Sequence, residues 1–239
     1  RSTQVPKINF STHPDIVDSI PHPKPASKFI PSWYKDLDRE YQCPVSEVTK
    51  RATIKQCLPV RDFITSGYII PAWCDMLFKK DSKGKIHFDD KMPSDFNSMY
   101  NMGFSAHDIK QVKGTPLEAF CDGEKLMKLN NPWVFRTPPN YSCFLMSPFY
   151  ETSDLTILPG VVDSDSHIIQ TNFPCVISSD EAFVKKGDPL AQVVPFKRDS
   201  WTSAVEGLDM REQTSFLVHF LTEIKSVYTT KLWKRKYYR

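Results

Sequence analysis

The residues best suited to chemistry lie close together at Asp163, Asp165 and His167. Two carboxylates and an imidazole can hold a divalent metal ion or perform general acid–base catalysis. Asp163 and His167 are the catalytic candidates, Asp165 and Gln192 are ligand-binding candidates, and Asp75 could join them. The competing interpretation makes Asp163 a turn aspartate and His167 a surface or strand histidine. It is favoured because one His without a spaced partner is little evidence for a site.

The six cysteines give no sign of a metal centre. No pair has C-x-x-C spacing and no His stands at a ligand spacing from a Cys, so neither a metal site nor a cofactor is predicted. Cysteines in apolar settings, such as Cys143, are typical of buried free thiols in a reducing compartment.

A second candidate site lies near residue 239, where cations alternate with Trp233, Tyr237 and Tyr238. Such a segment could bind phosphates while its rings stack on bases. Alternatively, it is a solvated helix end whose cations favour the helix C-terminus. The net charge of +3 is too small to indicate nucleic-acid binding by itself. The candidate nucleic-acid contacts are Lys234, Arg235, Lys236 and Arg239.

The composition favours strands and rigid loops as the elements that position these residues. There are 19 prolines and only 8 glycines, which suits a mainly β fold better than a helical bundle. The sequence contains no apolar run long enough to cross a membrane and does not open with a signal peptide, so a protein that is neither secreted nor membrane-bound is expected.

Three regions are predicted. Residues 1–35 form a proline-rich N-terminal arm, with a disordered leader as an equal alternative. Residues 36–200 form a β domain with an insertion near 79–131, and residues 201–239 form a C-terminal helix and basic tail. The helix prediction depends on one apolar face at helical spacing. That face comprises Leu217, Phe220, Leu221, Ile224 and Tyr228.

Within the β domain, alternation predicts strands over 53–58 and 68–73, with Gly67 marking the turn into the second. A polar hairpin is expected over 79–91, a long loop or insertion over 92–131, and a strand series over 133–196. Asn140 can take positive φ in a tight turn, and residues 186–188 form another turn.

Residues 133–197 contain three motifs whose order along the chain is informative. They are Thr-Pro-Pro-Asn-Tyr-Ser at 137–142, Leu-Pro-Gly-Val-Val-Asp-Ser-Asp at 158–165, and Lys-Lys-Gly-Asp-Pro-Leu-Ala-Gln at 185–192. In this order they resemble the core of the dUTPase and dCTP deaminase superfamily. The resemblance implies a β-clip fold, makes Tyr141 a further ligand-binding candidate, and matches Asp163 to the aspartate that activates the attacking water.

The same resemblance implies that ordinary dUTPase activity is absent. The family's sugar-packing Tyr is Ser166 here, and its Arg-Gly is replaced by His167 and Ile168. Its phosphate motif is replaced by Ser-Pro-Phe-Tyr at 147–150, and no glycine follows Gly207 to form the family's C-terminal lid. Triphosphate binding needs unobstructed backbone N–H groups together with Arg or Lys.

Residues 31–200 also resemble an uncharacterised family met in tailed-phage genomes. The shared motifs are Pro-Ser-Trp-Tyr-Lys at 31–35, Thr-Ile-Lys-Gln-Cys-Leu-Pro at 53–59, Gly-Tyr-Ile-Ile-Pro-Ala-Trp at 67–73, the segment at 160–165, and Asn-Phe-Pro at 172–174.

Two functions from different classes are therefore carried forward. The first is a non-enzymatic, phage-type structural or binding protein, acting in the virion or host cytoplasm as a homo-oligomer, with a trimer suspected, or with other virion proteins. The second is a nucleotide- or small-molecule-binding enzyme related to dUTP pyrophosphatase and dCTP deaminase, which alone would require Mg²⁺.

Overall fold

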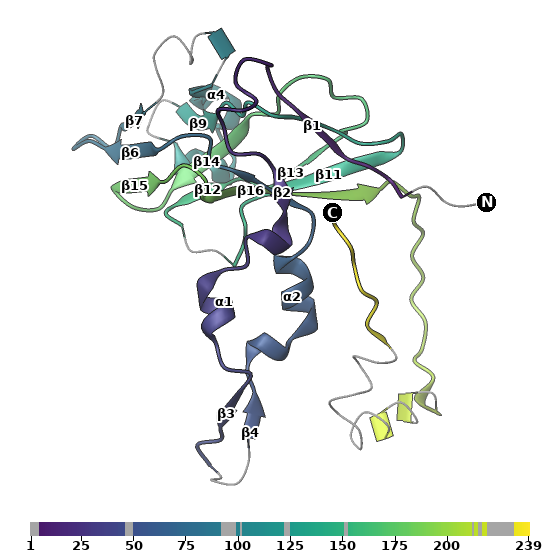
Figure 1. Ribbon diagram of the computed structural model, residues 1–239. Coiled ribbons are helices and arrows are strands. Elements are labelled where there is room, and N and C mark those ends of the chain that lie inside the picture. Colours follow the sequence, from purple (N-terminus) through teal and green to yellow (C-terminus); the bar gives the residue numbers. More distant parts are fainter. Residues whose placement is uncertain are drawn as a thin grey trace.

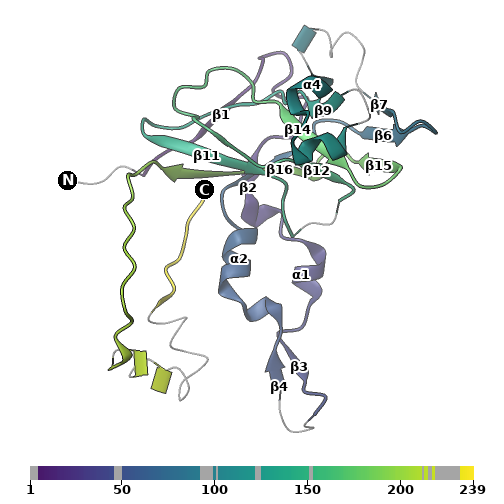
Figure 2. The ribbon, with the colours of Figure 1, turned by 180° about the vertical axis from the view of Figure 1, so that it is seen from behind.

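The computed structural model describes residues 5–45, 50–91, 99–100, 102–121, 125–150, 153–211, 213–214, 217–218 and 232–239. Strands outnumber helices among them, so the prediction of a mainly β protein is confirmed. Figures 1 and 2 show a β body from which α1, α2 and the hairpin β3–β4 project together, and we call this projection the stalk. No helix in the described part of the chain is long and apolar enough to cross a membrane.

The central sheet has five strands in the order β13-β11-β16-β5-β2. Their bounds are Gly160–Val162, Tyr141–Met146, Pro189–Lys197, Tyr68–Pro71 and Lys24–Pro25. All neighbouring strands are antiparallel. In β11, Cys143 and Leu145 turn into the core while Phe144 turns to the other face, as the two-residue period of a strand requires.

Two further sheets, one of four strands and one of three, belong to the body. One has the order β12-β14-β9-β8, over Leu155–Ile157, Phe173–Ile177, Lys125–Leu129 and Phe104–Asp108. The other has the order β15-β6-β7, over Glu181–Val184, Met76–Lys80 and Ile86–Asp90. The sheets enclose a single large core that includes Trp73, Phe78 and Phe173. The small helices α4 (Ile109–Val112) and η3 (Pro116–Phe120) join β8 to β9.

The described residues between 79 and 131 therefore contribute strands to the body. The hairpin expected over 79–91 is present as β6 and β7, with Gly84 at positive φ in its turn. The long loop expected over 92–131 is wrong for its described part. Here β8 pairs with β9, β9 pairs with β14, and Met102, Met127 and Leu129 are buried.

The proline-rich N-terminal segment lies across the body from residue 5 onward. Its strand β1 (Asn9–Ser11) pairs with β10 (Val134–Arg136), and β2 pairs with β5. Ile16 and Ile20 are buried in the main core, which anchors the segment between these two pairings.

The stalk contains η1 (Ala26–Lys28), α1 (Ser32–Asp36), β3 (Glu40–Gln42), β4 (Lys50–Ala52), η2 (Ile54–Gln56) and α2 (Leu58–Ile64). The strand predicted over 53–58 is thus wrong. Pro59 stands in the first turn of α2, where its fixed φ favours a helix start. Thr53 accordingly turns its hydroxyl back to the Arg39 carbonyl at 3.2 Å.

Beyond β16 the chain leaves the body as an extended segment (Figure 1), and residues 232–239 lie back against α2 and β5. The described residues between 210 and 218 include helical turns, and Leu217 is exposed. The other residues of the predicted helical face, from Phe220 to Tyr228, lie outside the described residues.

Candidate functional site

The segment after β13 forms a tight turn that presents the two candidate aspartates. The N–H groups of Ser166 and His167 donate to the Asp163 carbonyl at 3.1 and 2.9 Å. Ser164, between the aspartates, is fully buried and its hydroxyl lies 2.7 Å from that of Thr137. The turn is therefore fixed to the neighbouring β10–β11 connection, and Asp163 and Asp165 emerge on either side of a buried residue.

Arg198, one residue beyond β16, brings the two aspartates together. Its Nη1 lies 3.2 Å from Asp163 Oδ1 and 3.0 Å from Asp165 Oδ1, while Nη2 contacts Asp165 Oδ2. Ser142 donates its hydroxyl to Asp163 Oδ1 at 2.7 Å, and the Asn140 N–H donates to Asp165 Oδ2 at 2.9 Å. We call these five residues the Arg198 clasp.

The clasp also explains the conformation of the turn before β11. Asn140 has φ of 69°, the left-handed conformation expected for this position. Its carbonyl accepts from the Arg198 N–H at 2.8 Å, and its own N–H is held by Asp165. Asp165 thus links Arg198, which follows β16, to Asn140 in the turn before β11.

The electrostatics of the clasp are those of a satisfied ion pair. The hydrogen bond from Arg198 holds the pKa of Asp165 below its usual range, and Asp165 in turn raises the pKa of Arg198. The side chain of Asp165 is only 12% exposed, whereas that of Asp163 is 65% exposed. The guanidinium is bidentate on Asp165 and balances one of the two carboxylate charges, and at Asp163 Oδ1 it occupies a lone pair that a metal ion or a water would otherwise use.

The other sequence-predicted site residues lie apart from the clasp. Gln192 is buried and donates both amide hydrogens, to the carbonyls of Phe63 at 3.0 Å and Ser66 at 2.8 Å. Asp75 accepts from the Lys186 N–H at 2.7 Å and so holds the turn before β16. Neither residue shares a hydrogen bond with Asp163, so the structure does not assemble the full predicted cluster.

His167 follows Asp163 in the turn and is half-buried. Its Nε2 is buried and makes no hydrogen bond within the described residues. In that same part of the chain, no three His, Cys, Asp or Glu side chains gather closely enough to hold a metal ion.

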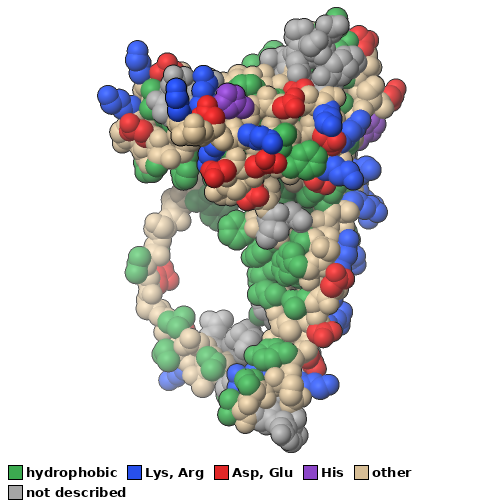
Figure 3. All heavy atoms as spheres, turned by 90° about the vertical axis from the view of Figure 1, so that its left-hand side faces the viewer, with side chains coloured by type: hydrophobic (Ala, Val, Ile, Leu, Met, Phe, Trp, Pro, Cys, Tyr) green, Lys and Arg blue, Asp and Glu red, His purple; other side chains and the backbone are tan. Residues whose placement is uncertain are grey.

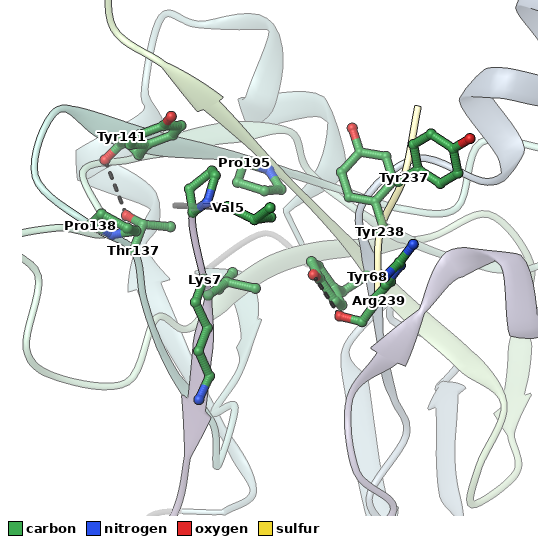
Figure 4. Close-up of a pocket in the computed structure, with 12 residues that line it drawn as sticks. Val5, Lys7, Tyr68, Thr137, Pro138, Tyr141, Pro195, Tyr237, Tyr238 and Arg239 are labelled. Carbon is green, nitrogen blue, oxygen red and sulfur yellow. Dashed lines mark hydrogen bonds between the residues drawn. The ribbon is translucent and has the colours of Figure 1, made fainter. Parts of the chain in front are cut away.

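Tyr141 lines a cavity of about 700 Å³ at one end of the central sheet. Figure 4 shows Tyr141 with residues 137–138 on one side and residues 237–239 on the other, with Val5 and Lys7 between them. Strands β5, β11 and β16 contribute Tyr68, Tyr141 and Pro195. The lining is mostly aromatic, aliphatic and proline, with two cations. The residues are Val5, Pro6, Lys7, Ile8, Tyr68, Thr137, Pro138, Tyr141, Pro195, Tyr237, Tyr238 and Arg239.

The basic tail is attached to the body through Asp62. Trp233 Nε1 donates to Asp62 at 2.8 Å, and Lys236 forms an ion pair with the same carboxylate. Burial would raise the pKa of Asp62, but the hydrogen bonds from Lys236 and Trp233 outweigh it and the pKa lies below its usual range. Arg61 lies over the Trp233 ring, 4.8 Å from its centre.

The remaining tail cations are placed differently from Lys236. Arg235 and Arg239 lie 5.0 and 5.9 Å from the centre of the Tyr237 ring. The Arg239 carbonyl accepts from the Tyr68 hydroxyl at 3.1 Å, and Lys234 is exposed. At least two cations thus sit on aromatic rings, as a stacked arginine commonly does.

Sequence reasoning missed Arg198 and Asp62, the two residues that organise these sites. Arg198 could have been suspected from its position one residue after β16. That strand pairs with β11, and Lys197 stands opposite Tyr141. Neither a comparison with protein-family models nor one with curated proteins finds a match to this chain.

Proposed function

We propose that this protein is a non-enzymatic structural or binding protein of the phage type, built on a dUTPase-like β-clip. It acts in the virion or the host cytoplasm. It does so as a homo-oligomer, with a trimer suspected, or together with other virion proteins. The observation that carries the proposal is the Arg198 clasp. Asp163, the residue matched to the water-activating aspartate, accepts from Arg198 and Ser142. A general base needs its lone pairs directed at the proton that it removes.

The segment matched to the phosphate motif supports the same conclusion. Residues 147–150 belong to an aromatic junction between stalk and body. Phe149 and Tyr150 pack edge-on against Phe63, and Trp33 Nε1 donates to the Tyr150 carbonyl at 2.7 Å. Ser147 accepts from the Ile157 N–H at 2.7 Å. This segment offers packing in place of the Arg that a phosphate group requires.

A nucleotide- or small-molecule-binding enzyme is the alternative, and the cavity favours it. Tyr141 and Tyr68 offer ring faces there, and Lys7 and Arg239 offer positive charge. Mg²⁺ enters only in this alternative, as a companion of bound phosphates.

Incubation with dUTP or dCTP and Mg²⁺ separates the two functions. We expect no release of pyrophosphate or ammonia above a protein-free blank, and no difference between the native chain and Asp163→Asn. Turnover that Asp163→Asn abolishes would establish the enzyme and refute the proposal. Co-sedimentation with phage particles from an infected lysate tests the virion role, and recovery of all the protein in the free fraction would count against it.

A further inference from the structure

The segment that leaves β16 is unusually exposed for its composition. Every residue from 197 to 211 is exposed, and we call residues 199–211 the strap. Trp201 and Val205 are 88% and 102% exposed, and Leu208 and Met210 are also largely exposed. Residues 199–209 form neither helix nor strand. A row of large apolar side chains held in water along an extended backbone indicates a surface that binds something.

A second apolar surface lies on the central sheet, next to the point where the strap begins after β16. Phe144 stands opposite Val161 on one side and Val194 on the other. The ring centroids of Phe144 and Phe196 lie 4.6 Å apart, and Phe144 and Val161 are both exposed. We call these four residues the open half-face.

The rest of this sheet face is covered by the stalk. Ile69 and Gln192, which are cross-strand partners, are buried, and Gln192 is bonded to the end of α2. The stalk therefore covers one half of the face. In the other half Phe144 and Val161 are exposed and Val194 and Phe196 are half-buried, and the Arg198 clasp borders it at Ser142. At the stalk, Phe149 is 76% exposed although its ring packs against Phe63 of α2.

The strap does not cover the open half-face of its own chain. Figures 1 and 2 show it running away from the sheet, and Figure 3 shows an opening between it and the stalk. Within the described residues, Trp201 makes no ring contact with the sheet, and the ion pair Lys197–Asp199 joins the strap to β16 at its root.

We propose that the strap docks on the open half-face of a second copy of this chain. Each copy carries both surfaces, so one contact repeated by symmetry would satisfy all copies. An extended chain advances about 3.3 Å per residue, so residues 199–209 of the strap can span roughly 35 Å, enough to reach a neighbouring sheet. Burial of Trp201 alone removes roughly 200 Å² from water, and a mutual exchange approaches the roughly 800 Å² per partner of a standard interface.

This inference deepens the proposed function, on which it rests, because it identifies the partner as the same chain. Sedimentation over a wide concentration range tests it. We expect the native chain to associate, and Trp201→Ser with Val205→Ser to weaken association at least about tenfold, as loss of an aromatic anchor does. Val161→Glu should do the same from the receiving surface.

The matched control is Ile168→Ser with Ile169→Ser, which removes two exposed apolar residues outside both surfaces. It should leave association unchanged. Near-ultraviolet circular dichroism and thermal unfolding of every variant verify that each is folded.

A cross-linking experiment identifies the contact itself. Val205→Cys in a tagged chain is mixed with Val161→Cys in an untagged chain and treated with a short bis-maleimide. We expect a linked pair of unequal chains, joined at 205 and 161 by mass spectrometry, well above the background from the native cysteines. A linkage only within single chains, a strictly monomeric native protein, or strap variants that associate like the native chain would each overturn the inference.

The failures of the two proposals are distinguishable. Dependence of association on the strap together with turnover of dUTP would leave the strap contact standing and refute the proposed function. Association that ignores the strap, together with no turnover, would do the reverse.

Discussion

Gly67 offers the sharpest test of how the central sheet is built. It precedes β5 at φ +68°, and a Cβ added there would lie 2.1 Å from the Val193 carbonyl oxygen and 2.9 Å from its carbon. Both atoms are backbone of β16, which β5 pairs with through Tyr68 and Val193. Because no flexible side chain can yield, Gly67→Ala must displace one strand from the other.

The expected cost has two parts. An alanine in left-handed conformation costs about 1–2 kcal/mol. Separating β5 from β16 weakens one or two ladder hydrogen bonds and the packing around them, at about 1 kcal/mol per bond. We therefore expect Gly67→Ala to lower the free energy of unfolding by about 3–4 kcal/mol, a large part of the roughly 5–15 kcal/mol of a typical domain.

Gly187→Ala is the matched control, since Gly187 has φ +93° and open space around its Cα. It carries the conformational cost without the clash. Urea unfolding followed by tryptophan fluorescence, with equal m-values, measures both. Equal losses in the two variants would refute the reasoning, because the contact with Val193 would then contribute nothing.

Three further outcomes are expected. Gln192→Leu should destabilise the protein by about 1–3 kcal/mol in urea unfolding, because the part-buried Ser66 carbonyl loses the Gln192 amide and the Phe63 carbonyl keeps only the Ser66 N–H; an unchanged midpoint would contradict this. Because the folded-state pKa of Asp165 lies below its usual range, its contribution to stability is complete above about pH 4 and is lost as the pH falls through the lowered value. Arg198→Gln should therefore flatten the acid side of a stability-versus-pH curve, and an identical curve would argue against the clasp. Burial raises the pKa of Cys143 to about 11 and that of Cys175 to about 12, so neither should react with a disulfide reagent at pH 8 until denaturant is added; labelling of Cys175 in the native protein, seen by mass spectrometry, would show that the core opens.

Features governed by local chemistry could be predicted from the sequence. The left-handed Asn140, the turn over 186–188, the strand after Gly67 and the hairpin over 79–91 all depend on residues that are neighbours in the chain. The segment 53–58 misled because its alternation is that of a strand, whereas Pro59 and contacts with residues 35–39 favour helical turns.

The candidate site depended on register, which spacing does not reveal. Arg198 meets Asp163 and Asp165 only because β16 lies beside β11 and ends opposite Tyr141. The sequence alone was equally compatible with Gln192 facing a ligand. In the structure, α2 covers that half of the sheet and accepts its hydrogen bond. The residue types therefore identified the two aspartates as candidates. Their roles depended on Arg198, which lies 35 residues after Asp163 and 33 residues after Asp165 in the chain.

The cavity beneath Tyr141 has a practical consequence for anyone attaching this protein to something else. Residues 5–8 and 237–239 both line it, so two segments from opposite ends of the described chain meet on one side of the body. Labels attached at residues 7 and 237 would therefore report on each other by energy transfer at close range. Immobilisation through a side chain of either segment would turn the same side of the body toward the support.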